Sequence, residues 1–360
     1  MQLRETALRL RFFVGLAALC STFTACKKPE TGPPLYAKPP LLGADLSLLP
    51  EVRKSTSAWY NRSGQQEDML QTLVYAGINL VRLRLWHTPE AGASLEELRK
   101  LCETLRGMGL KTLISIHYSD TWADPAQQSK PQAWKNLTGQ SLGDSVFAYT
   151  QSVMQVLHPD YVQIGNEINQ GLLWPDGHRS DTGKMLSLLR AGIRAVRSSN
   201  PNTQIVLHLA LTDGAELLPE AWRGLDYDLL GLSYYPMWHG KNLDGLKSRL
   251  KLMVQQFGKP VFIAETAYPF TLGWNDETHN VLGLQEQLLP EFSATPEGQR
   301  AYLLALRKLL LDVSGAVGFC YWGGEWTAFK GSSARDGSSW ENQALWDFRG
   351  HALPALDVFW

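Results

Sequence analysis

Apolar, β-rich segments alternate with segments of helical period along most of the chain. Eight segments have the length and composition of strands: residues 41–48, 79–86, 111–119, 161–168, 204–211, 229–236, 260–269 and 316–322. Strands that alternate with helices are typical of parallel βαβ units, because parallel strands need a crossover connection. The pattern therefore predicts an α/β protein with a parallel sheet.

The helical segments fall between these strands. The clearest begins at a capping box of Ser94 and Glu97, and Leu98, Cys102 and Leu105 follow on one face. Similar stripes run through residues 146–157, 185–196, 243–253 and 302–311. Right-handed crossovers between eight strands predict closure into a single-domain (β/α)8 TIM barrel. An open doubly wound sheet is the alternative, but residues 43–47 lack the glycine-rich phosphate loop expected after its first strand.

The N-terminal segment has the features of an export signal. Arginines precede an apolar run at residues 12–19, and small residues lead to Cys26. Residues 23–26 resemble a bacterial lipoprotein processing site, so we expect a signal peptide over 1–25, lipidation of Cys26, a flexible tether over 26–40 and the barrel domain over 41–360. Ordinary signal cleavage is the alternative. We expect a monomer held at the outer membrane or cell surface by lipid alone, because the apolar run is too short to span a bilayer.

The composition narrows the classes of function. Lys and Arg (34) balance Asp and Glu (35), so the chain lacks the basic field that nucleic acid binding requires. The chain has 13 Trp, a residue that lines sugar-binding clefts and fills cores. Cys102 and Cys320 fall in predicted elements and suit buried thiols, although a disulfide between them stays open.

Polar and aromatic residues gather where the predicted strands end, which is the edge of a barrel that carries the active site. Arg82 and Arg84 alternate with apolar residues, so both guanidinium groups should face the barrel interior and need partners. The other candidates at this edge are His117, Asp120, Trp122, Asn166, Glu167, Tyr234, Trp238, Glu265 and Trp322.

Two of these candidates are glutamates, Glu167 on the fourth strand and Glu265 on the seventh, and they can face each other across the barrel mouth. A single glutamate at a strand end is more often an ion-pair partner. Glycosidic cleavage needs two carboxyl groups, one to protonate the leaving oxygen and one to meet the developing positive charge. The pair therefore favours glycoside hydrolysis.

Several motifs together resemble glycoside hydrolase family 53, the arabinogalactan endo-β-1,4-galactanases. They are GADLS at 43–47, VRLRLW at 81–86, HYSDTWADP at 117–125, GNEI at 165–168, LWPDG at 173–177, GLSYYP at 231–236, ETAYP at 265–269 and WENQAL at 340–345. The similarity runs from about residue 41 to residue 354. It implies a retaining endo-hydrolase of β-1,4-galactan, the side-chain polymer of pectin, with Glu167 as acid/base and Glu265 as nucleophile.

The resemblance also implies roles around the two glutamates. Glu167 must start protonated, so its pKa should be raised, chiefly by Glu265 and by partial desolvation, and Arg82 or Arg84 should keep Glu265 ionised. Asn166 would hydrogen-bond the 2-hydroxyl of the reacting sugar. His117, Asp120, Tyr234 and Trp322 would shape the reacting subsite, and Trp86, Trp122, Trp174 and Trp238 would stack on sugars or pack at the rim. His208, inside the fifth strand, is expected to be a hydrogen-bonded core residue.

No cofactor is required by this chemistry, and the eight histidines include no His-x-His or His-Glu-x-x-His pattern for a catalytic metal. The resemblance does raise structural calcium in the loop at 274–280, which keeps oxygen donors and would need help from 332–336. Two alternatives stay open: a non-catalytic lipoprotein that captures glycan, and a related barrel hydrolase acting on glucan, mannan or xylan.

Overall fold

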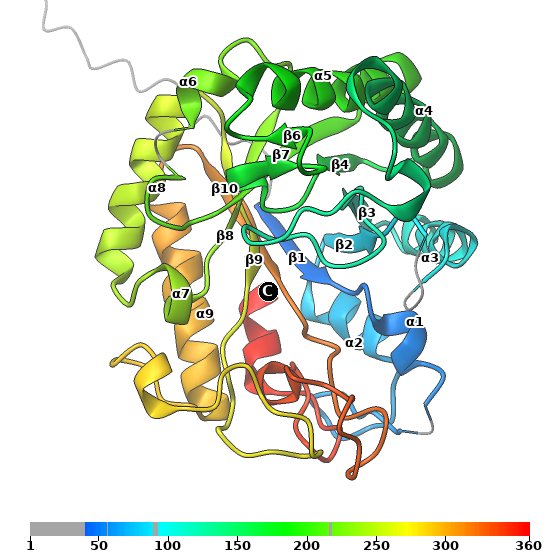
Figure 1. Cartoon of the computed structure of the whole chain (residues 1–360). Coiled ribbons are helices and arrows are strands. Elements are labelled where there is room, and N and C mark those ends of the chain that lie inside the picture. The colour runs from blue at the N-terminus through cyan, green and yellow to red at the C-terminus, as the bar shows by residue number, and fades with distance from the viewer. Residues whose placement is uncertain (1–39, 56, 89–92, 216–217) are drawn as a thin grey trace, which may run out of the picture. The chain divides into compact units, whose positions relative to one another are not determined.

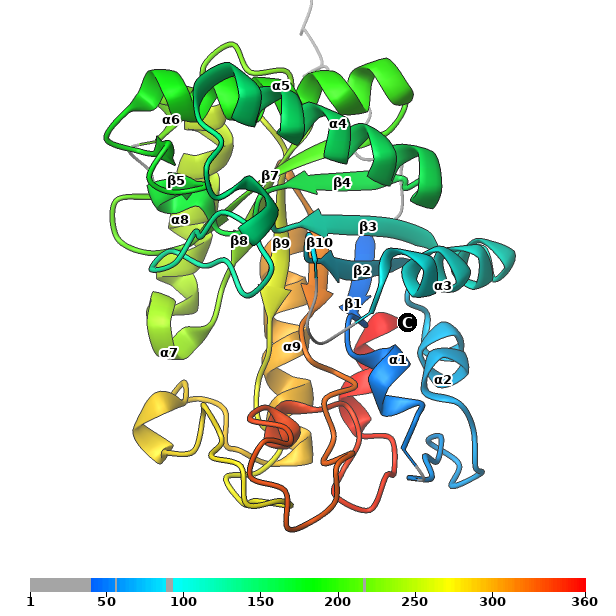
Figure 2. The same cartoon turned by 45° about the vertical axis from the view of Figure 1, so that its right-hand side comes forward.

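The computed structural model describes residues 40–55, 57–88, 93–215 and 218–360. The predicted signal peptide, the tether up to residue 39 and Cys26 lie outside these residues. The described part forms one compact unit, Pro40–Trp360. Its strands close into a parallel barrel in the order β1-β10-β9-β8-β7-β4-β3-β2, with helices around it (Figures 1 and 2). The predicted (β/α)8 TIM barrel is confirmed.

All eight predicted strands are present in the barrel. They are β1 (Leu41–Asp45), β2 (Leu80–Leu85), β3 (Lys111–Ile116), β4 (Tyr161–Ile164), β7 (Gln204–Ala210), β8 (Leu229–Ser233), β9 (Val261–Thr266) and β10 (Ala316–Tyr321). A short antiparallel pair, β5 (Gly171–Leu172) and β6 (Gly177–His178), follows β4. Every barrel strand ends before its predicted end, because the last polar residues leave the ladder and turn toward the barrel mouth. Tyr118 and Glu167, for example, have positive φ angles.

The helices are α1 (Leu49–Val52), α2 (Met69–Ala76), α3 (Leu95–Gly107), α4 (Gly139–Leu157), α5 (Thr182–Ser199), α6 (Pro219–Trp222), α7 (Pro236–His239), α8 (Leu243–Phe257), α9 (Pro296–Leu311) and the terminal 3-10 helix η6 (Pro354–Phe359). Five helices, α3, α4, α5, α8 and α9, cover the five predicted helical stripes, whereas the shorter α1, α2, α6, α7 and η6 were not predicted. The capping box of Ser94 and Glu97 starts α3 as predicted. In the described part of the chain, no helix is long and apolar enough to cross a bilayer.

The core has two layers with different roles. The larger apolar layer lies between the strands and the surrounding helices. A smaller cluster fills the barrel interior with Leu41, Leu80, Leu113, Val206, Leu229, Phe262, Ala264 and Cys320. Cys102 belongs to the outer layer, and both cysteines are buried free thiols, which settles the question of a disulfide between them. We call this smaller cluster in the barrel interior the apolar plug. It closes the barrel below the carboxyl ends of the strands, so the polar groups above it form the floor of a site.

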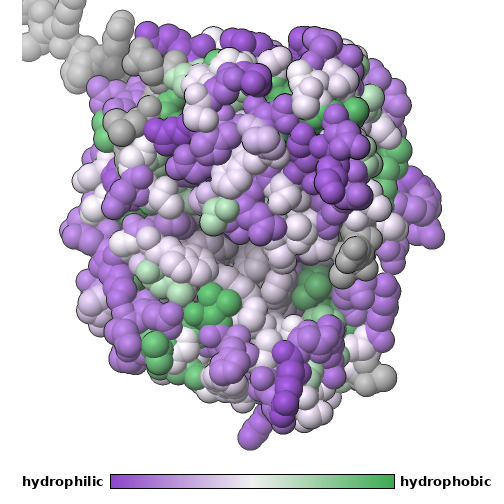
Figure 3. All heavy atoms as spheres, in the orientation of Figure 1, coloured by the Kyte–Doolittle hydropathy of each residue, from purple (hydrophilic) through white to green (hydrophobic). Residues whose placement is uncertain are grey.

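The long connections after β9 and β10 gather at one side of the barrel mouth, at the bottom of the view in Figure 1 and coloured yellow to red. The opposite side is built by the connections after β3 and β4. The surface in the same orientation is hollowed near the middle of this face (Figure 3).

Candidate active site

The side chain of Arg82 is the centre of the polar layer above the apolar plug. Its guanidinium is 1% exposed, with Nη1 2.7 Å from Asp45 Oδ2 and Nη2 2.8 Å from Glu265 Oε1. It also donates to Gln163 Oε1 at 3.2 Å and to Asn166 Oδ1 at 2.8 Å. Burial disfavours the charged form, but Glu265 and Asp45 outweigh it and raise the pKa of Arg82. The guanidinium is therefore a fixed positive charge.

Glu265 reaches this layer through an irregularity in β9. Ala264 already faces the apolar plug, so strict alternation would turn the next side chain outward. The pairing of β8 with β9 shifts between Leu232 and Ser233, where Ser233 pairs with Glu265, and this bulge lets Glu265 face the interior as well. Its Oε2 accepts a hydrogen bond of 2.9 Å from the hydroxyl of Tyr235.

Opposing effects act on the pKa of Glu265. Burial raises the pKa of this carboxyl, while Arg82 and the hydrogen bond from Tyr235 act to lower it. Burial is the largest effect, so the pKa of Glu265 is raised overall, but the ion pair with Arg82 limits the rise and favours the ionised form relative to Glu167. Of the two arginines considered from the sequence, Arg82 is the one that contacts Glu265.

Glu167 is held by a strained turn at the end of β4. Gly165 and Glu167 both have positive φ, and a Cβ on Gly165 would lie 2.6 Å from Ile168 Cγ2, so this position requires glycine. The backbone N–H of Glu167 donates to His208 Nδ1 at 3.2 Å. Left-handed backbone at a non-glycine residue is costly and concentrates at functional sites.

The pKa of Glu167 is raised to about 8. Burial is the largest cause and the charge of Glu265 the second, which reverses the order expected from the sequence. A hydrogen bond from the Ser233 hydroxyl opposes the shift. Glu167 forms no ion pair with any residue that the structure describes, so this carboxyl holds its proton near neutral pH while Glu265 has a guanidinium partner.

His208 lies 0% exposed beneath Glu167 and was expected only as a core residue. Burial and the charge of Arg82 lower the pKa of His208 well below its ordinary value, so the ring is neutral. Its Nδ1 accepts N–H bonds from Glu167 and Gln163, and Nε2 therefore carries the hydrogen and donates to Ser233 Oγ at 3.0 Å. The core prediction is correct, but the partners of His208 are the site residues themselves.

Asn166 uses its side-chain oxygen inside the protein. That oxygen accepts from Arg82 and from Gln163 Nε2 at 2.9 Å, and Nδ2 donates to the carbonyl of Ala123 at 2.9 Å. One amide hydrogen stays available. The amide orientation is set by these contacts, because exchanging oxygen and nitrogen would place donors against Arg82.

Tyr235, not Tyr234, is the tyrosine at the carboxylates. The Tyr234 hydroxyl donates to the carbonyl of Gly240 at 2.9 Å, so its assignment to the reacting subsite is corrected. The reason is strand alternation: Ser233 faces inward, Tyr234 outward and Tyr235 inward again. This period was readable in the sequence, as was the interior position of Gln163.

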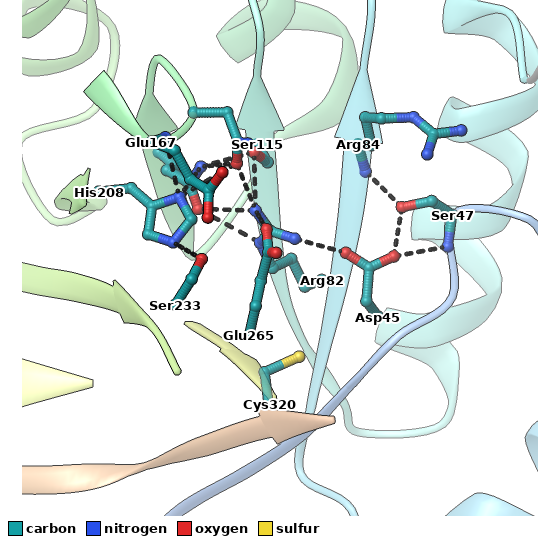
Figure 4. A network of polar contacts seen from close by, with 12 residues as sticks. Asp45, Ser47, Arg82, Arg84, Ser115, Glu167, His208, Ser233, Glu265 and Cys320 are labelled. Atoms are coloured by element: carbon teal, nitrogen blue, oxygen red, sulfur yellow. Dashed lines mark hydrogen bonds and ion pairs between the residues drawn. The ribbon is translucent and has the colours of Figure 1, made fainter. Parts of the chain in front are cut away.

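Arg84 and Asp120 differ from expectation in their contacts. The guanidinium of Arg84 points away from Glu265 (Figure 4) and lies between the rings of Trp86 and Trp122, 4.2 and 4.1 Å from their centroids. Burial lowers the pKa of Arg84 to about 10. Asp120 accepts the backbone N–H groups of Thr88 and Gln132, at 2.9 and 2.7 Å, and so ties two loops together.

His117 lies under Trp122 at the mouth of the barrel. It is 4% exposed, and its Nδ1 accepts the N–H of Ala123 at 3.3 Å. Burial, then Arg84 and Arg82, lower the pKa of His117 well below its ordinary value, so this ring is a neutral polar group.

Aromatic side chains form a continuous row across the mouth. Trp122 lies 6.1 Å from Trp322, and Trp322 lies 4.5 Å from Trp340 between ring centroids. Trp340 in turn contacts Trp238 at 6.2 Å. The row also includes Trp326, Trp340 and Tyr235, which were not predicted as site residues from the sequence. Trp174 instead donates to the carbonyl of Gln170 beside His178.

The loop suggested for calcium is cross-linked by hydrogen bonds. Both oxygens of Asp276 accept backbone N–H groups, from Thr278 and Ser338, and Glu341 Oε1 accepts two more. Glu341 Oε2 and Asn280 Oδ1 are buried without partners, but two oxygens fall short of the six to eight that calcium takes. Among the described residues, no cluster of His, Cys, Asp and Glu suits a metal ion. The donor set does not fit calcium.

The sequence is similar to those of several known proteins over most of the barrel. The model of glycosyl hydrolase family 53 matches residues 41–359. An arabinogalactan endo-beta-1,4-galactanase of Cellvibrio japonicus is 36% identical over 88% of this chain and 90% of that protein. An endo-beta-1,4-galactanase of Bacillus subtilis is 32% identical over 88% of this chain and 84% of that protein.

Solved structures agree with these sequence matches. The GH53 catalytic domain of Ignisphaera aggregans has a TM-score of 0.83 and 35% identity, and the match covers 91% of this chain and 98% of that domain. Together with the match over nearly the whole barrel, this likeness shows that the chain belongs to glycosyl hydrolase family 53.

Proposed function

We propose that the chain is an endo-acting β-1,4-galactanase that cleaves galactan side chains of pectin with retention of anomeric configuration. The observation that carries this proposal is the unequal surroundings of two buried carboxyl groups at one barrel mouth. Arg82 pairs with Glu265, and burial raises the pKa of Glu167 to about 8. The galactanase relatives support the choice of polymer.

In the first step, the Glu265 carboxylate attacks the anomeric carbon of the bound galactose. Glu167 gives its proton to the departing glycosidic oxygen, and a covalent galactosyl ester on Glu265 results. Arg82 and Tyr235 hold Glu265 in place for the attack. In the second step, the Glu167 carboxylate takes a proton from water, the resulting hydroxide attacks the same carbon, and Glu265 leaves as a carboxylate.

The free amide hydrogen of Asn166 supports transition-state binding. Its oxygen is held by Arg82 and Gln163, so the remaining N–H of Nδ2 is a preorganised donor for the 2-hydroxyl of the reacting sugar. The neutral ring of His117 accepts from Ala123 at Nδ1 and therefore offers its Nε2–H as a donor at the same mouth. Trp86 and the row of aromatic side chains from Trp122 to Trp238 offer ring faces to sugars on either side of the cleaved bond.

Location and assembly form a separate part of the proposal. The exported chain would be lipidated at Cys26, held by a tether to residue 40, and active as a monomer at the outer membrane or cell surface. Cys26→Ser should move the protein from the membrane fraction to the soluble fraction. Unchanged fractionation would contradict lipidation.

Product analysis tests the function. The purified protein is incubated separately with linear β-1,4-galactan, glucan, mannan and xylan, and the products are separated by chromatography. Short galacto-oligosaccharides should appear early and only from galactan. Cleavage of another polymer would favour a different barrel hydrolase, and binding to galactan without cleavage would favour a surface capture protein.

A further inference from the structure

A cavity of about 270 Å³ opens on the outer wall of the barrel, between α2 and η6. Ala76 and Leu356 are buried at its floor, while Tyr75 and Trp360 stand beside it with 62% and 79% of their surfaces exposed. None of the residues that build the candidate active site lines this cavity.

The backbone that carries Trp360 is held in place by the neighbouring helices. Gly77 ends α2 with a left-handed backbone, and a Cβ there would lie 2.6 Å from the carbonyl oxygen of Phe359. Glycine therefore lets η6 pack closely against the end of α2. Arg307 also donates to the carbonyl oxygens of Val358 and Trp360. Two exposed aromatic side chains beside a buried apolar floor form one apolar patch, which suggests an occupant.

The rim of the cavity is polar, but its charges are partly satisfied. Glu67 accepts hydrogen bonds from Thr72 at 2.6 Å and Asn61 at 3.3 Å. Arg62 lies 3.4 Å from Asp357. Arg300 lies 3.8 Å from the other oxygen of Asp357, so two carboxylates are balanced by two guanidinium groups. The rim therefore has no net positive charge to attract an anionic polymer, whereas carboxylate oxygens readily accept the hydroxyl hydrogens of a neutral sugar.

We propose that this cavity, lined by Tyr75 and Trp360, is a second galactan-binding site. It would receive a short stretch of the neutral chain, with the C–H face of a galactose against the indole and hydroxyl groups toward Glu67 and Asp357. The inference rests on the proposed function, because the occupant is the polymer that the barrel mouth cleaves. A long chain bound at both sites dissociates more slowly than one bound at the mouth alone.

Affinity electrophoresis in gels that contain linear β-1,4-galactan tests the site. The full chain carries Glu167→Gln, so that the polymer survives the run. Trp360→Ala and Tyr75→Ala should each weaken the apparent affinity for the polymer by about five- to tenfold. Tyr75→Phe keeps the ring and should change it little, and Leu311→Ala removes an exposed apolar side chain elsewhere and should leave it unchanged.

The active chain with the same substitutions separates this inference from the proposed function. Turnover of a galactotetraose, too short to reach both sites, should be unchanged by Trp360→Ala. Equal polymer affinity of Trp360→Ala and the parent would overturn the second site, even while galactan is cleaved. The second site would also be overturned if polygalacturonate, and not galactan, retarded the protein. The same holds if Trp360→Ala abolished a self-association of the protein but left its affinity for galactan intact. Failure to cleave galactan at all would reject the proposed function independently.

Discussion

The ends of β4 and β9 carry the same residue type in opposite surroundings. Glu265 accepts a hydrogen bond from Tyr235 and lies 2.8 Å from the guanidinium of Arg82. Glu167 rests on neutral groups, with His208 beneath its backbone and the Ser233 hydroxyl beside it. The difference teaches that the roles of acid and nucleophile are assigned by neighbours and not by the carboxyl groups themselves.

The two strand ends also use different backbone devices. A bulge in β9 turns Glu265 inward after Ala264, and a left-handed residue after Gly165 turns Glu167 toward the mouth. Both devices place a carboxyl group in the same polar layer.

The largest effect should come from removing either carboxylate. Glu265→Gln removes the nucleophile and should lower kcat on galactan by about 10⁴-fold or more. Glu167→Gln removes the acid and should cost about 10² to 10⁴-fold, with a smaller loss on an aryl galactoside whose leaving group needs no proton. Initial rates on both substrates measure the contrast.

Azide distinguishes the two positions further. With Glu167→Gln, azide should accelerate turnover and give a β-galactosyl azide, because it attacks the covalent ester without a general base. With Glu265→Gln, any azide product should have the α configuration. The reverse pattern would exchange the two roles, and loss of the folded circular dichroism spectrum in both variants would leave neither assigned.

A second contrast concerns the two arginines of β2. Arg82→Lys keeps the charge but cannot reach Asp45, Glu265 and Asn166 together, so kcat should fall by about 10²-fold. Arg84→Lys leaves the carboxylates untouched and should act mainly on KM, through the stack with Trp86 and Trp122. Steady-state kinetics on galactan measure both. A larger kcat loss for Arg84→Lys would contradict the central position of Arg82.

Much of this arrangement could be predicted from the sequence. The eight strands are readable because β-rich segments alternate with helical stripes, and polar residues at strand ends are readable because parallel strands end at one edge. The partner of Glu265 could not be predicted from the sequence, because both Arg82 and Arg84 face inward by alternation and only packing shows which of them contacts Glu265. The bulge at Glu265 has no local signal. Tyr235 and Gln163 could have been found by following the period of two through β8 and β4.

The pH dependence of activity sharpens the comparison. Because Glu167 must be protonated, kcat/KM should fall on the alkaline side around its raised pKa of about 8. Glu265 must be ionised, so Tyr235→Phe, which removes a hydrogen bond that lowers the pKa of Glu265, should move the acidic limb to higher pH. The alkaline limb should stay in place. Tyr234→Phe is the matched control, and an equal shift in both variants would contradict the contact.

The smallest expected effect is on stability. A carboxyl whose folded pKa is raised to about 8 binds its proton more tightly in the folded state, so stability is lost as pH rises from about 4.3 toward 8. Glu167→Gln removes this loss. The difference in melting temperature between the variant and the parent should therefore be roughly 2 to 4 °C larger at pH 8.5 than at pH 5.

Glu325 provides a second test of the same argument away from the reaction. Burial and then Asp45 raise its pKa to about 8, and only one of its oxygens has a partner, the N–H of Leu48 at 2.8 Å. Glu325→Gln should therefore also flatten the fall in stability with pH, whereas the exposed Glu286→Gln should follow the parent. A parent-like slope in Glu167→Gln, with a flatter one in Glu325→Gln, would mean that Glu167 is ionised in the folded protein at neutral pH. Arg82 would then have to stabilise two carboxylates, and the division of roles between β4 and β9 would fail.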